Sequence, residues 1–469
     1  MKIKLLLFCS FWALLLAVSC NRDEISFEEP SAELRFSRDT VFCDTVYHQI
    51  RSETYVVKVF NTEDKDVLIP RINLEKGASS LYKINVDGKA GYDFQNVPLR
   101  KKDSLYIFVE IAAQANGPEA IAEDRVLFST PAGKQHVTLF SVVQDAEFFI
   151  QTPSNPNVIT SNTVWNSNKA KIIYGNLTVN PNVTLDVDAG TKIYFHKNSG
   201  MKVSGGGKLN LNGTQTNQVI VRGDRNDTYY DTIPRNWNSI KMEAASVLNM
   251  NHTRLFGGTR GLDMRQTTAN ISNSFIHTFQ EYGIYAVGST VNARNLVMNN
   301  SGESCIGIFL GGNHSYTHCT IANYSATMGS LPRMGIFAAN EWKNDSGQIV
   351  QGALQNLSIR NSIVYSDKDN SVNLSPTNGQ QFQFSLVNSL IKYSNAAAAQ
   401  FDFDNTMYVI QSIKNQDPKF VNYFAAQMNL RVKTDSPAKN KGSAAIAATV
   451  PTDIVGVSRT TSPTLGAYQ

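Results

Sequence analysis

A short phrase of glycine, a branched apolar residue and a bulky apolar residue recurs in the second half of the chain. Its clear copies are Gly283-Ile284-Tyr285, Gly307-Ile308-Phe309 and Gly335-Ile336-Phe337, and a weaker copy begins at Gly261. The glycines lie 22, 24 and 28 residues apart. A period in the low twenties is typical of stacked repeat units, and units this short cannot bury their apolar face alone. The chain must therefore fold as a stack.

A second phrase, in which asparagine follows an apolar residue by two positions, runs in step with the first. It occupies residues 271–276, 359–364 and 386–391, with looser copies centred on His252, Asn295 and Cys319. Apolar residues alternate within each unit, which indicates strands, and the leucine-rich repeat pattern is absent. We therefore expect an all-β parallel β-helix, with room for about ten coils over residues 164–393 at this period.

Stacked strands repeat every 4.8 Å or so, which places equivalent side chains in columns. The asparagines of the second phrase are expected in one such column at an inside corner, where amides bond to one another and to the turn backbone. His252 and Cys319 fill the same positions, so we interpret both as packing residues. The column members are Asn273, Asn295, Asn361 and Asn388.

The chain begins with the pattern of a secretory signal. Lys2 and Lys4 precede an apolar run over residues 5–18, which is too short to span a membrane. The segment 16–20, ending in Ser19-Cys20, resembles a bacterial lipobox, which implies cleavage after residue 19 and lipid attachment to Cys20. Residues 20–32 are expected to form an acidic tether that resembles a surface-export signal. These features predict an outer-membrane protein, lipid-anchored and facing the cell exterior.

Residues 33–148 contain about seven alternating apolar runs separated by turn signals, without the 22-residue period. This pattern predicts a β-sandwich. The order of its features, including Val59-Phe60-Asn61 at a strand end, resembles the immunoglobulin-like domains of the abnormal-spindle and hydin type. That resemblance implies a binding or spacing module.

The end of the chain carries a linear series of motifs, namely Asp417-Pro418-Lys419-Phe420, Ser436-Pro437-Ala438, Asp453-Ile454-Val455-Gly456 and Leu465-Gly466-Ala467-Tyr468. The series resembles the C-terminal segment of right-handed parallel β-helix lipoproteins of Gram-negative envelopes. The resemblance implies a right-handed β-helix over residues 149–412 and a closing segment over residues 413–469. We expect this segment to cover the last coil, with Asp453 and Arg459 paired across it.

Charge and cysteine content exclude several functions. Loss of residues 1–19 removes Lys2 and Lys4 and lowers the formal charge from +4 to +2, which gives no basis for nucleic-acid binding. Beyond Cys9 and Cys20 only three cysteines remain, without the spacing of a zinc site, so no metal or cofactor is expected. A Cys305–Cys319 disulfide stays open as an alternative.

An enzyme is the rival interpretation, because parallel β-helices include polysaccharide lyases and hydrolases. Hydrolases need paired carboxylates facing one groove, and the sequence predicts no two carboxylates at equivalent positions of adjacent coils. The best charged set, a fallback for a lyase or hydrolase, is Arg254, Arg260, Asp263 and Arg265. Asp263 and Arg265 are expected on one face of a strand. Exposed charge pairs explain the same residues, so no catalytic residue is assigned.

Aromatic residues in irregular stretches suggest ligand binding instead. Tyr229, Tyr230 and Trp237 lie in or beside residues 224–236, and Trp342 lies in residues 340–352. Such rings can stack on sugars, although Trp237 also fits a core position. The sequence thus predicts a non-catalytic display, adhesion or glycan-binding protein. The alternatives are a polysaccharide-degrading enzyme and a structural subunit of an outer-membrane complex.

Overall fold

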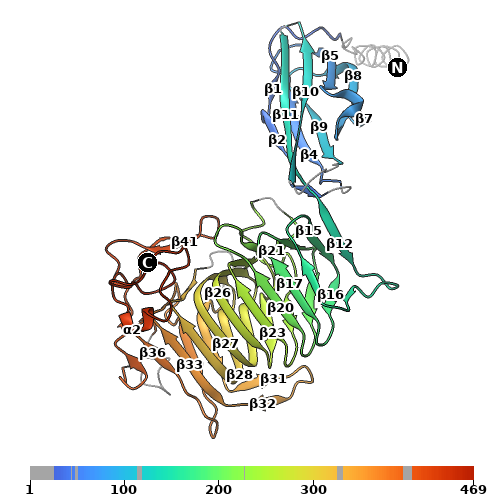
Figure 1. The fold of residues 1–469 in the computed structure, drawn as a ribbon. Helices are drawn as coiled ribbons and strands as arrows, with labels where there is room; N and C mark the ends of the chain where they lie inside the picture. Colours follow the sequence, from blue (N-terminus) through green and yellow to red (C-terminus); the bar gives the residue numbers. More distant parts are fainter. Residues whose placement is uncertain are drawn as a thin grey trace, which may run out of the picture. The chain divides into compact units, whose positions relative to one another are not determined.

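The structure is a computed structural model, and it describes residues 26–43, 45–47, 51–112, 119–131, 133–225, 228–324, 331–393 and 404–469. The predicted signal segment and Cys20 lie outside these residues. The chain is all-β and divides into two compact units, with the boundary between Val143 and Gln144. Figure 1 labels many of the strands.

The first unit consists of two mainly antiparallel sheets whose strands alternate buried and exposed residues. One sheet contains, in order, β1 (Arg35–Phe36), β4 (Tyr55–Phe60), β9 (Ser104–Ile111), β6 (Tyr82–Val86) and β7 (Lys89–Gly91). The other contains β2 (Thr40–Phe42), β11 (Gly133–Gln144), β10 (Glu119–Thr130), β5 (Val67–Leu74) and β8 (Asp93–Leu99), and β3 (Val46–Tyr47) also pairs with β11. A short 3₁₀ helix, η1, spans Gly77–Ser79.

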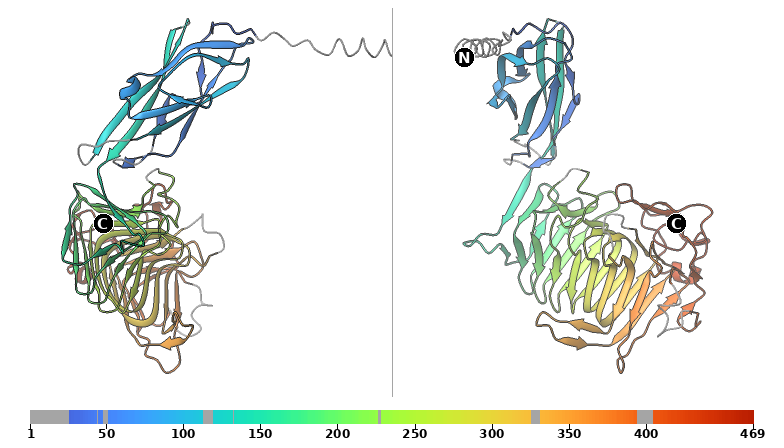
Figure 2. Two further views of the ribbon diagram at one scale, coloured as in Figure 1. Left: turned by 90° about the vertical axis from the view of Figure 1, so that its right-hand side faces the viewer. Right: turned by 180° about the vertical axis from the view of Figure 1, so that it is seen from behind.

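The second unit is a single curled sheet of 26 strands. Consecutive strands of the chain lie on different sides of the curl. Over its first part each strand pairs in parallel with the strand three places further on, as β12 does with β15 and β13 with β16. The chain therefore winds around and stacks its strands on three sides, called sides A, B and C below. Figures 1 and 2 show the stacked strands from several directions.

The three sides are defined by their strands. Side A contains β12 (Ala146–Ile150), β15 (Ala170–Tyr174), β18 (Lys192–Phe195), β21 (Val219–Gly223), β24 (Thr253–Phe256), β29 (Thr320–Asn323), β34 (Ile363–Ser366), β37 (Leu390–Ile391) and β39 (Ile413–Lys414). Side B contains β13 (Val158–Ile159), β16 (Asn176–Val179), β19 (Gly200–Val203), β22 (Ile240–Met242), β25 (Leu262–Arg265), β30 (Met334–Ala339) and β35 (Val372–Ser375).

Side C contains β14 (Thr163–Trp165), β17 (Thr184–Asp188), β20 (Lys208–Asn212), β23 (Val247–Asn251), β33 (Leu354–Arg360), β36 (Ser385–Val387) and β38 (Val409–Ile410). Three long strands turn the corners: β26 (Thr268–Phe279) runs from side C to A, β27 (Tyr282–Ser301) through B, C and A, and β28 (Ser304–Thr317) from B to C. The remaining elements are two hairpins, β31–β32 (Glu341–Lys343, Ile349–Gln351) and β40–β41 (Phe420–Asn422, Asn429–Val432), and α2 (Ala444–Ala447).

The interior of the coil is one continuous apolar core that extends from Ile159 to Val409. Parallel strands that alternate inward and outward residues supply it, as the sequence periodicity predicts. Cys305 and Cys319 lie in this core as free thiols, so the disulfide alternative is wrong. Their sulfurs contact the carbonyl oxygens of Ala322 and Thr317 at 3.0 and 3.5 Å.

The predicted asparagine column exists and forms a corner between sides C and A. Asn273, Asn295, Asn361 and Asn388 all have positive φ, from 46° to 50°, a conformation that asparagine tolerates better than most residues. The Asn295 amide donates to Asn273 Oδ1 at 2.8 Å. His252 fits the same corner, with φ of 40°. The prediction for Cys319 is wrong by one residue, because His318, with φ of 53°, holds the corner and Cys319 points inward.

The C-terminal segment does more than close the last coil. It packs along the outer face of side A, where Val297, Ala322, Ile363 and Leu390 point outward and form a second apolar cluster with Leu430, Ile454 and Leu465. It also bonds to the corner column, since Asn295 and Asn361 donate to the carbonyls of Thr452 and Ser443 at 3.0 and 2.9 Å. Outward apolar residues on side A need this cover. Figure 1 shows the red segment with α2 beside β33 and β36.

The expected Asp453–Arg459 pair is not a direct contact. Arg459 is 1% exposed and donates to the carbonyl oxygens of Val450, Thr452, Gly466 and Ala467. Asp453 instead accepts hydrogen bonds from the backbone amides of Val455 and Val457 at 2.9 and 2.7 Å. Each side chain thus organises the segment through its backbone.

Candidate functional site

The outer face of side B carries a row of aromatic rings. Tyr285 of β27, Phe309 of β28 and Phe337 of β30 come from three successive coils. The Tyr285 and Phe309 ring centroids are 4.8 Å apart, and those of Phe309 and Phe337 are 5.4 Å apart. Tyr282 joins the row at 5.2 Å from Tyr285. All four rings are partly exposed, so they offer an apolar surface to a ligand.

The β31–β32 hairpin forms one wall beside this row. Its Trp342 donates from Nε1 to the Tyr285 hydroxyl at 2.9 Å, and its Asp345 accepts a hydrogen bond from Arg265 at 2.8 Å. The Arg265 guanidinium also lies 5.4 Å from the Trp342 ring centre. These contacts from two sides of the hairpin hold it against the sheet. An insertion in the repeat thereby places a tryptophan over the aromatic row.

Charged side chains form the opposite rim, at the corner between sides A and B. Arg260 bonds Glu281 at 2.5 Å, contacts Asp263 at 3.4 Å and lies 4.4 Å above the Tyr285 ring. Asp263 also pairs with Arg265 at 3.3 Å, which confirms that these two residues share one face of the strand. The result is a chain of alternating charges that ends at the hairpin.

Glu303 lies one coil beyond Glu281, since its backbone amide donates to the Glu281 carbonyl at 2.9 Å. Burial and the negative charge of Glu281 raise the pKa of Glu303. Burial also raises the pKa of Tyr282 to about 12. The prediction that no two carboxylates share a position in adjacent coils is therefore wrong at this place.

Together these residues enclose a groove of about 530 Å³. Its lining includes Arg260, Glu281, Tyr282, Tyr285, Glu303, Phe309, Phe337, Trp342 and Lys343. A volume of this size, with aromatic and charged lining, is typical of a small-molecule or sugar site. We call it the aromatic groove.

The predicted site residues separate into two groups in the structure. Trp342 and Arg260 line the aromatic groove, and Asp263 and Arg265 support it through Arg260 and the hairpin. The sequence predicts Trp342 in a binding site and the charged residues in a rival enzyme site. The structure brings them together in one place.

Trp237 is a core residue, and the ligand-binding hypothesis for it is wrong. It is 1% exposed, its ring stacks on Phe195 at 4.7 Å, and its Nε1 donates to the Phe256 carbonyl at 2.9 Å. A ring buried in this way has no surface for a ligand.

Tyr229, Tyr230 and Arg254 lie away from the groove. Tyr229 is 65% exposed and meets Tyr230 edge-on at 5.4 Å, while the Arg225 guanidinium lies 4.2 Å from the Tyr230 ring. Arg254 lines a different cavity, on side A. The structure therefore does not join these three residues to Trp342.

The register of the strands explains why the position of Glu303 beside Glu281 was missed. The aromatic row was visible in the sequence, since Tyr285, Phe309 and Phe337 occupy the same position of the repeated phrase. The sequence phrase aligns Gly307 with Gly283, but in the structure Gly307 pairs with Tyr285, and Ile306 pairs with Ile284. The phrase is thus shifted by two residues in this coil, which preserves the inward and outward alternation. A period of 22 residues applied strictly from Glu281 leads to Glu303 and is the signal that would have found it.

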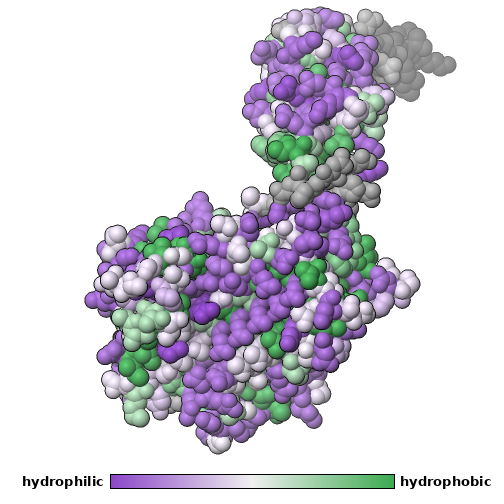
Figure 3. All heavy atoms as spheres, in the orientation of Figure 1, coloured by the Kyte–Doolittle hydropathy of each residue, from purple (hydrophilic) through white to green (hydrophobic). Residues whose placement is uncertain are grey.

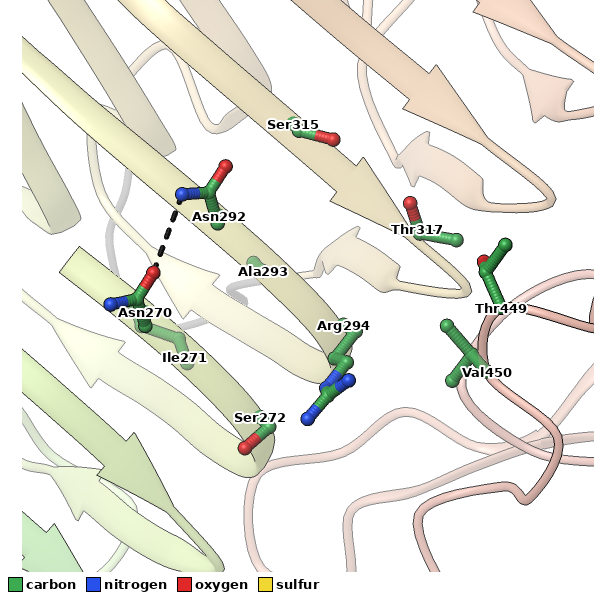
Figure 4. Close-up of a pocket in the computed structure, with 10 residues that line it drawn as sticks. All are labelled: Asn270, Ile271, Ser272, Asn292, Ala293, Arg294, Ser315, Thr317, Thr449 and Val450. Carbon is green, nitrogen blue, oxygen red and sulfur yellow. Dashed lines mark hydrogen bonds between the residues drawn. The ribbon is translucent and has the colours of Figure 1, made fainter. Parts of the chain in front are cut away.

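Side C carries a different surface, an external ladder of amides. Asn210 donates to Asp186 at 2.7 Å, Asn249 to Asn210 at 2.8 Å and Asn270 to Asn249 at 3.0 Å. The face turned to the viewer in Figure 3, which includes these strands, is mainly hydrophilic. A hollow of about 410 Å³ lies at its edge, beside Arg294, Thr449 and Val450. Figure 4 shows the Asn292–Asn270 bond, which continues the ladder at 3.3 Å.

Two negative findings hold for the residues that the structure describes. They contain no group of three or more histidine, cysteine, aspartate or glutamate side chains placed to hold a metal ion. None of the helices among them is long and apolar enough to cross a membrane.

Comparisons with known proteins add little. No family model and no curated protein matches the chain. Solved structures that match in part include a Vibrio cholerae protease, VesB (12% identity, TM-score 0.17, covering 24% of this chain and 31% of that one). Others are a family 123 glycoside hydrolase from Clostridium perfringens (11%, 0.19, 27% and 26%) and a Porphyromonas gingivalis W83 protein of unknown function (12%, 0.17, 28% and 57%). The chain spans less than two thirds of each of them, and likeness this weak supports no argument.

Proposed function

We propose that this protein binds glycans in the aromatic groove of side B. The observation that carries the proposal is the row of partly exposed rings, Tyr282, Tyr285, Phe309 and Phe337, faced by Trp342 from the hairpin. Aromatic faces pack on the apolar faces of sugar rings, while flanking charged groups bond to hydroxyls. Rings repeated from coil to coil suit a ligand that is itself a repeating chain.

The proposal extends to the architecture and the location. The curled parallel sheet supports a right-handed parallel β-helix of about ten coils, a count that rests on the 22-residue period. The two-sheet first unit supports an immunoglobulin-like spacer. Attachment through Cys20 would display both units outside the outer membrane. Incorporation of labelled palmitate by the wild type and not by Cys20→Ser tests the anchor, and protease shaving of intact cells tests the outward display.

The binding test is a glycan array probed with the purified full-length chain, followed by affinity measurements on the best ligand. Trp342→Ala should weaken binding about tenfold to a hundredfold, the effect of losing one well-packed aromatic contact. Tyr229→Ala is the matched control, since it removes an exposed aromatic ring outside the groove and should leave the affinity unchanged. Equal loss in both variants, or no bound glycan at all, would contradict the proposal.

A second candidate function is glycoside hydrolysis in the same groove, and the Glu281–Glu303 pair favours it. Glu281 is ion-paired with Arg260, whereas the raised pKa of Glu303 favours the protonated form that a general acid needs. Incubation of the bound glycan for a day, with assay of reducing ends, distinguishes the two functions. Release of ends that Glu303→Gln abolishes while binding persists would establish hydrolysis, and binding without release supports the non-catalytic role.

A further inference from the structure

A second cavity, of about 470 Å³, lies on the outer face of side A beneath residues 425–428 of the C-terminal segment. Three strands supply its floor, each with two outward positions. Ile220 and Arg222 on β21, Arg254 and Phe256 on β24, and His277 on β26 line the cavity, as does Asp231, while Phe275 on β26 points outward beside Arg254. The aromatic groove is on side B, so this cavity is a separate place.

Arg254 brings an uncompensated positive charge to the cavity. Among the described residues its guanidinium has no ion pair and no hydrogen bond, and its packing contact is the Phe275 ring at 5.3 Å. Burial lowers the pKa of Arg254, but an arginine stays charged at neutral pH. A half-buried cation without an acceptor costs free energy, and a bound anion would remove this cost.

Arg222, the second arginine of the cavity, is already neutralised. It pairs with Asp231 at 2.5 Å and donates to the carbonyl oxygens of Gly223 and Arg225 at 3.3 and 2.5 Å. The charges of Arg222 and Asp231 cancel, so Arg254 leaves a net charge of +1 on these three residues. The cavity therefore favours a ligand with one negative charge.

His277 adds a buried hydrogen-bonding group to the lining of the same cavity. It is 2% exposed, its ring stacks on Phe256 at 4.9 Å, and its Nδ1 lies 2.9 Å from the Thr278 hydroxyl. Its Nε2 is buried without a hydrogen-bond partner. Burial lowers the pKa of His277 well below its usual value, so the ring is neutral. A Thr278 hydroxyl that donates to Nδ1 leaves the proton on Nε2, which has no acceptor among the described residues.

We propose that the side A cavity binds a monocarboxylate the size of an acidic sugar. The Arg254 guanidinium would form a charge-assisted bond with the carboxylate, and His277 Nε2–H would donate to the same group. The volume exceeds the needs of a bare anion and lies within the range of small-molecule sites. An acidic sugar carries one carboxylate and fills the rest of the space with its ring.

Calorimetric titration of the purified full-length chain with glucuronate, glucose and acetate tests the site. Glucuronate should bind, glucose should not, and acetate should bind at least about tenfold more weakly. Arg254→Gln and His277→Phe should each weaken glucuronate binding about tenfold or more, since each removes one donor. Arg294→Gln, at an exposed arginine on side C, is the control and should bind as the wild type does. Unaltered affinity in Arg254→Gln, or no glucuronate binding by the wild type, would overturn the proposal, and equal affinity for acetate would overturn the sugar-sized ligand.

A measurement without ligand gives an independent test of the unpaired Arg254 guanidinium. Arg254→Met keeps an apolar stem against Phe275 and removes the charge, so its melting temperature should rise above that of the wild type. Arg294→Met should leave the melting temperature unchanged, because its side chain is exposed. A fall in the melting temperature of Arg254→Met would show that the guanidinium already has a stabilising partner, and the proposal would fail.

Discussion

Sides A and B use the same stacked parallel strands, yet their outer faces differ. Side A points Val297, Ile363 and Leu390 outward and is covered by the C-terminal segment. Side B points aromatic rings outward and is flanked by a hairpin that leaves the aromatic groove between them. The difference lies in the chain segments outside the repeat. A coil thus supplies a uniform scaffold, and insertions and terminal segments decide which of its faces can bind.

Cover on side A depends on polar anchors as well as on apolar contact. From the coil, Asn361 donates to the Ser443 carbonyl of the C-terminal segment, and Asn299 donates to its Tyr423 carbonyl at 2.9 Å. Arg459 bonds within the segment. On side B the anchors are the Trp342 and Asp345 contacts of the hairpin. The first set is buried and the second partly exposed. We therefore expect larger effects on stability from changes on side A than on side B.

The largest expected effect is that of Arg459→Ala. It removes a buried guanidinium that donates to four carbonyl oxygens and should lower the free energy of unfolding by about 3–5 kcal/mol. Urea unfolding followed by tryptophan fluorescence measures it, since Trp165, Trp237 and Trp342 all lie in the second unit. Arg431→Ala, which removes an exposed arginine 4.7 Å from the Tyr468 ring, should cost less than about 1 kcal/mol. Similar losses would break the distinction between buried and exposed anchors.

The second prediction compares a corner amide with a surface amide. Asn361→Ala loses bonds to His318 and to Ser443, and forces alanine into a φ of 47°, so we expect a loss of about 2–3 kcal/mol. Asn292→Ala, in the exposed ladder of side C, should cost less than about 0.5 kcal/mol. Asn361→Gly relieves the backbone strain alone and should fall between them. Equal costs for Asn361→Ala and Asn292→Ala would contradict a structural role for the corner column.

The repeat made the interior predictable. Periodic apolar residues and asparagines at corners depend on local sequence, and the structure has the parallel curled sheet and the corner column that they indicate. The register was less accessible, since Gly307 repeats the phrase of Gly283 but pairs with Tyr285. Two strand registers that differ by two residues put the same side chains inward and outward. Apolar periodicity alone therefore cannot distinguish them.

The candidate site was only partly predictable, because it depends on contacts between distant segments. Trp342 stood out as an aromatic residue in an insertion, but its bond to Tyr285 joins residues 57 positions apart. Arg254 looked like a neighbour of Arg260, yet the corner between them sends the two to different sides of the coil. The core position that the sequence allowed for Trp237 is confirmed, but the partners on which it packs, Phe195 and Phe279, come from other coils.

The third prediction concerns acid stability at the covered corner. Burial, together with the charge of Arg459, lowers the pKa of His318 to about 3 from an ordinary 6.5. The folded protein therefore holds His318 neutral, whereas the unfolded chain takes up a proton below pH 6.5. The free energy of unfolding is unaffected by His318 above pH 6.5 and falls as the pH drops from 6.5 toward 3. His318→Asn places at this corner the residue that other coils use, and it takes up no proton. Between pH 7 and pH 4.5 the variant should lose about 1–3 kcal/mol less stability than the wild type.

Urea midpoints at the two pH values, again by tryptophan fluorescence, test this prediction. His136→Asn, at an exposed histidine of the first unit, is the control and should follow the wild type. The same slope with pH in His318→Asn and the wild type would show that His318 is not the group that acid protonates. The expected difference in stability between sides A and B would then depend on packing and not on the protonation of His318.

The smallest expected effect is an absence of cysteine labelling in the folded protein. It tests whether the interior, unlike the outer faces, is the same on sides A and B. Cys305 lies inside side B and Cys319 inside the corner near side A, and burial raises the pKa of both thiols to about 12. At pH 8 only about one part in ten thousand of each would be thiolate, and neither is accessible, so iodoacetamide should modify neither in the folded protein. Both should react in urea, as mass spectrometry of the peptides would show. Rapid labelling of one cysteine but not the other would mean that the coil opens on one side. The interior of the coil would then differ between sides A and B, as their outer faces do.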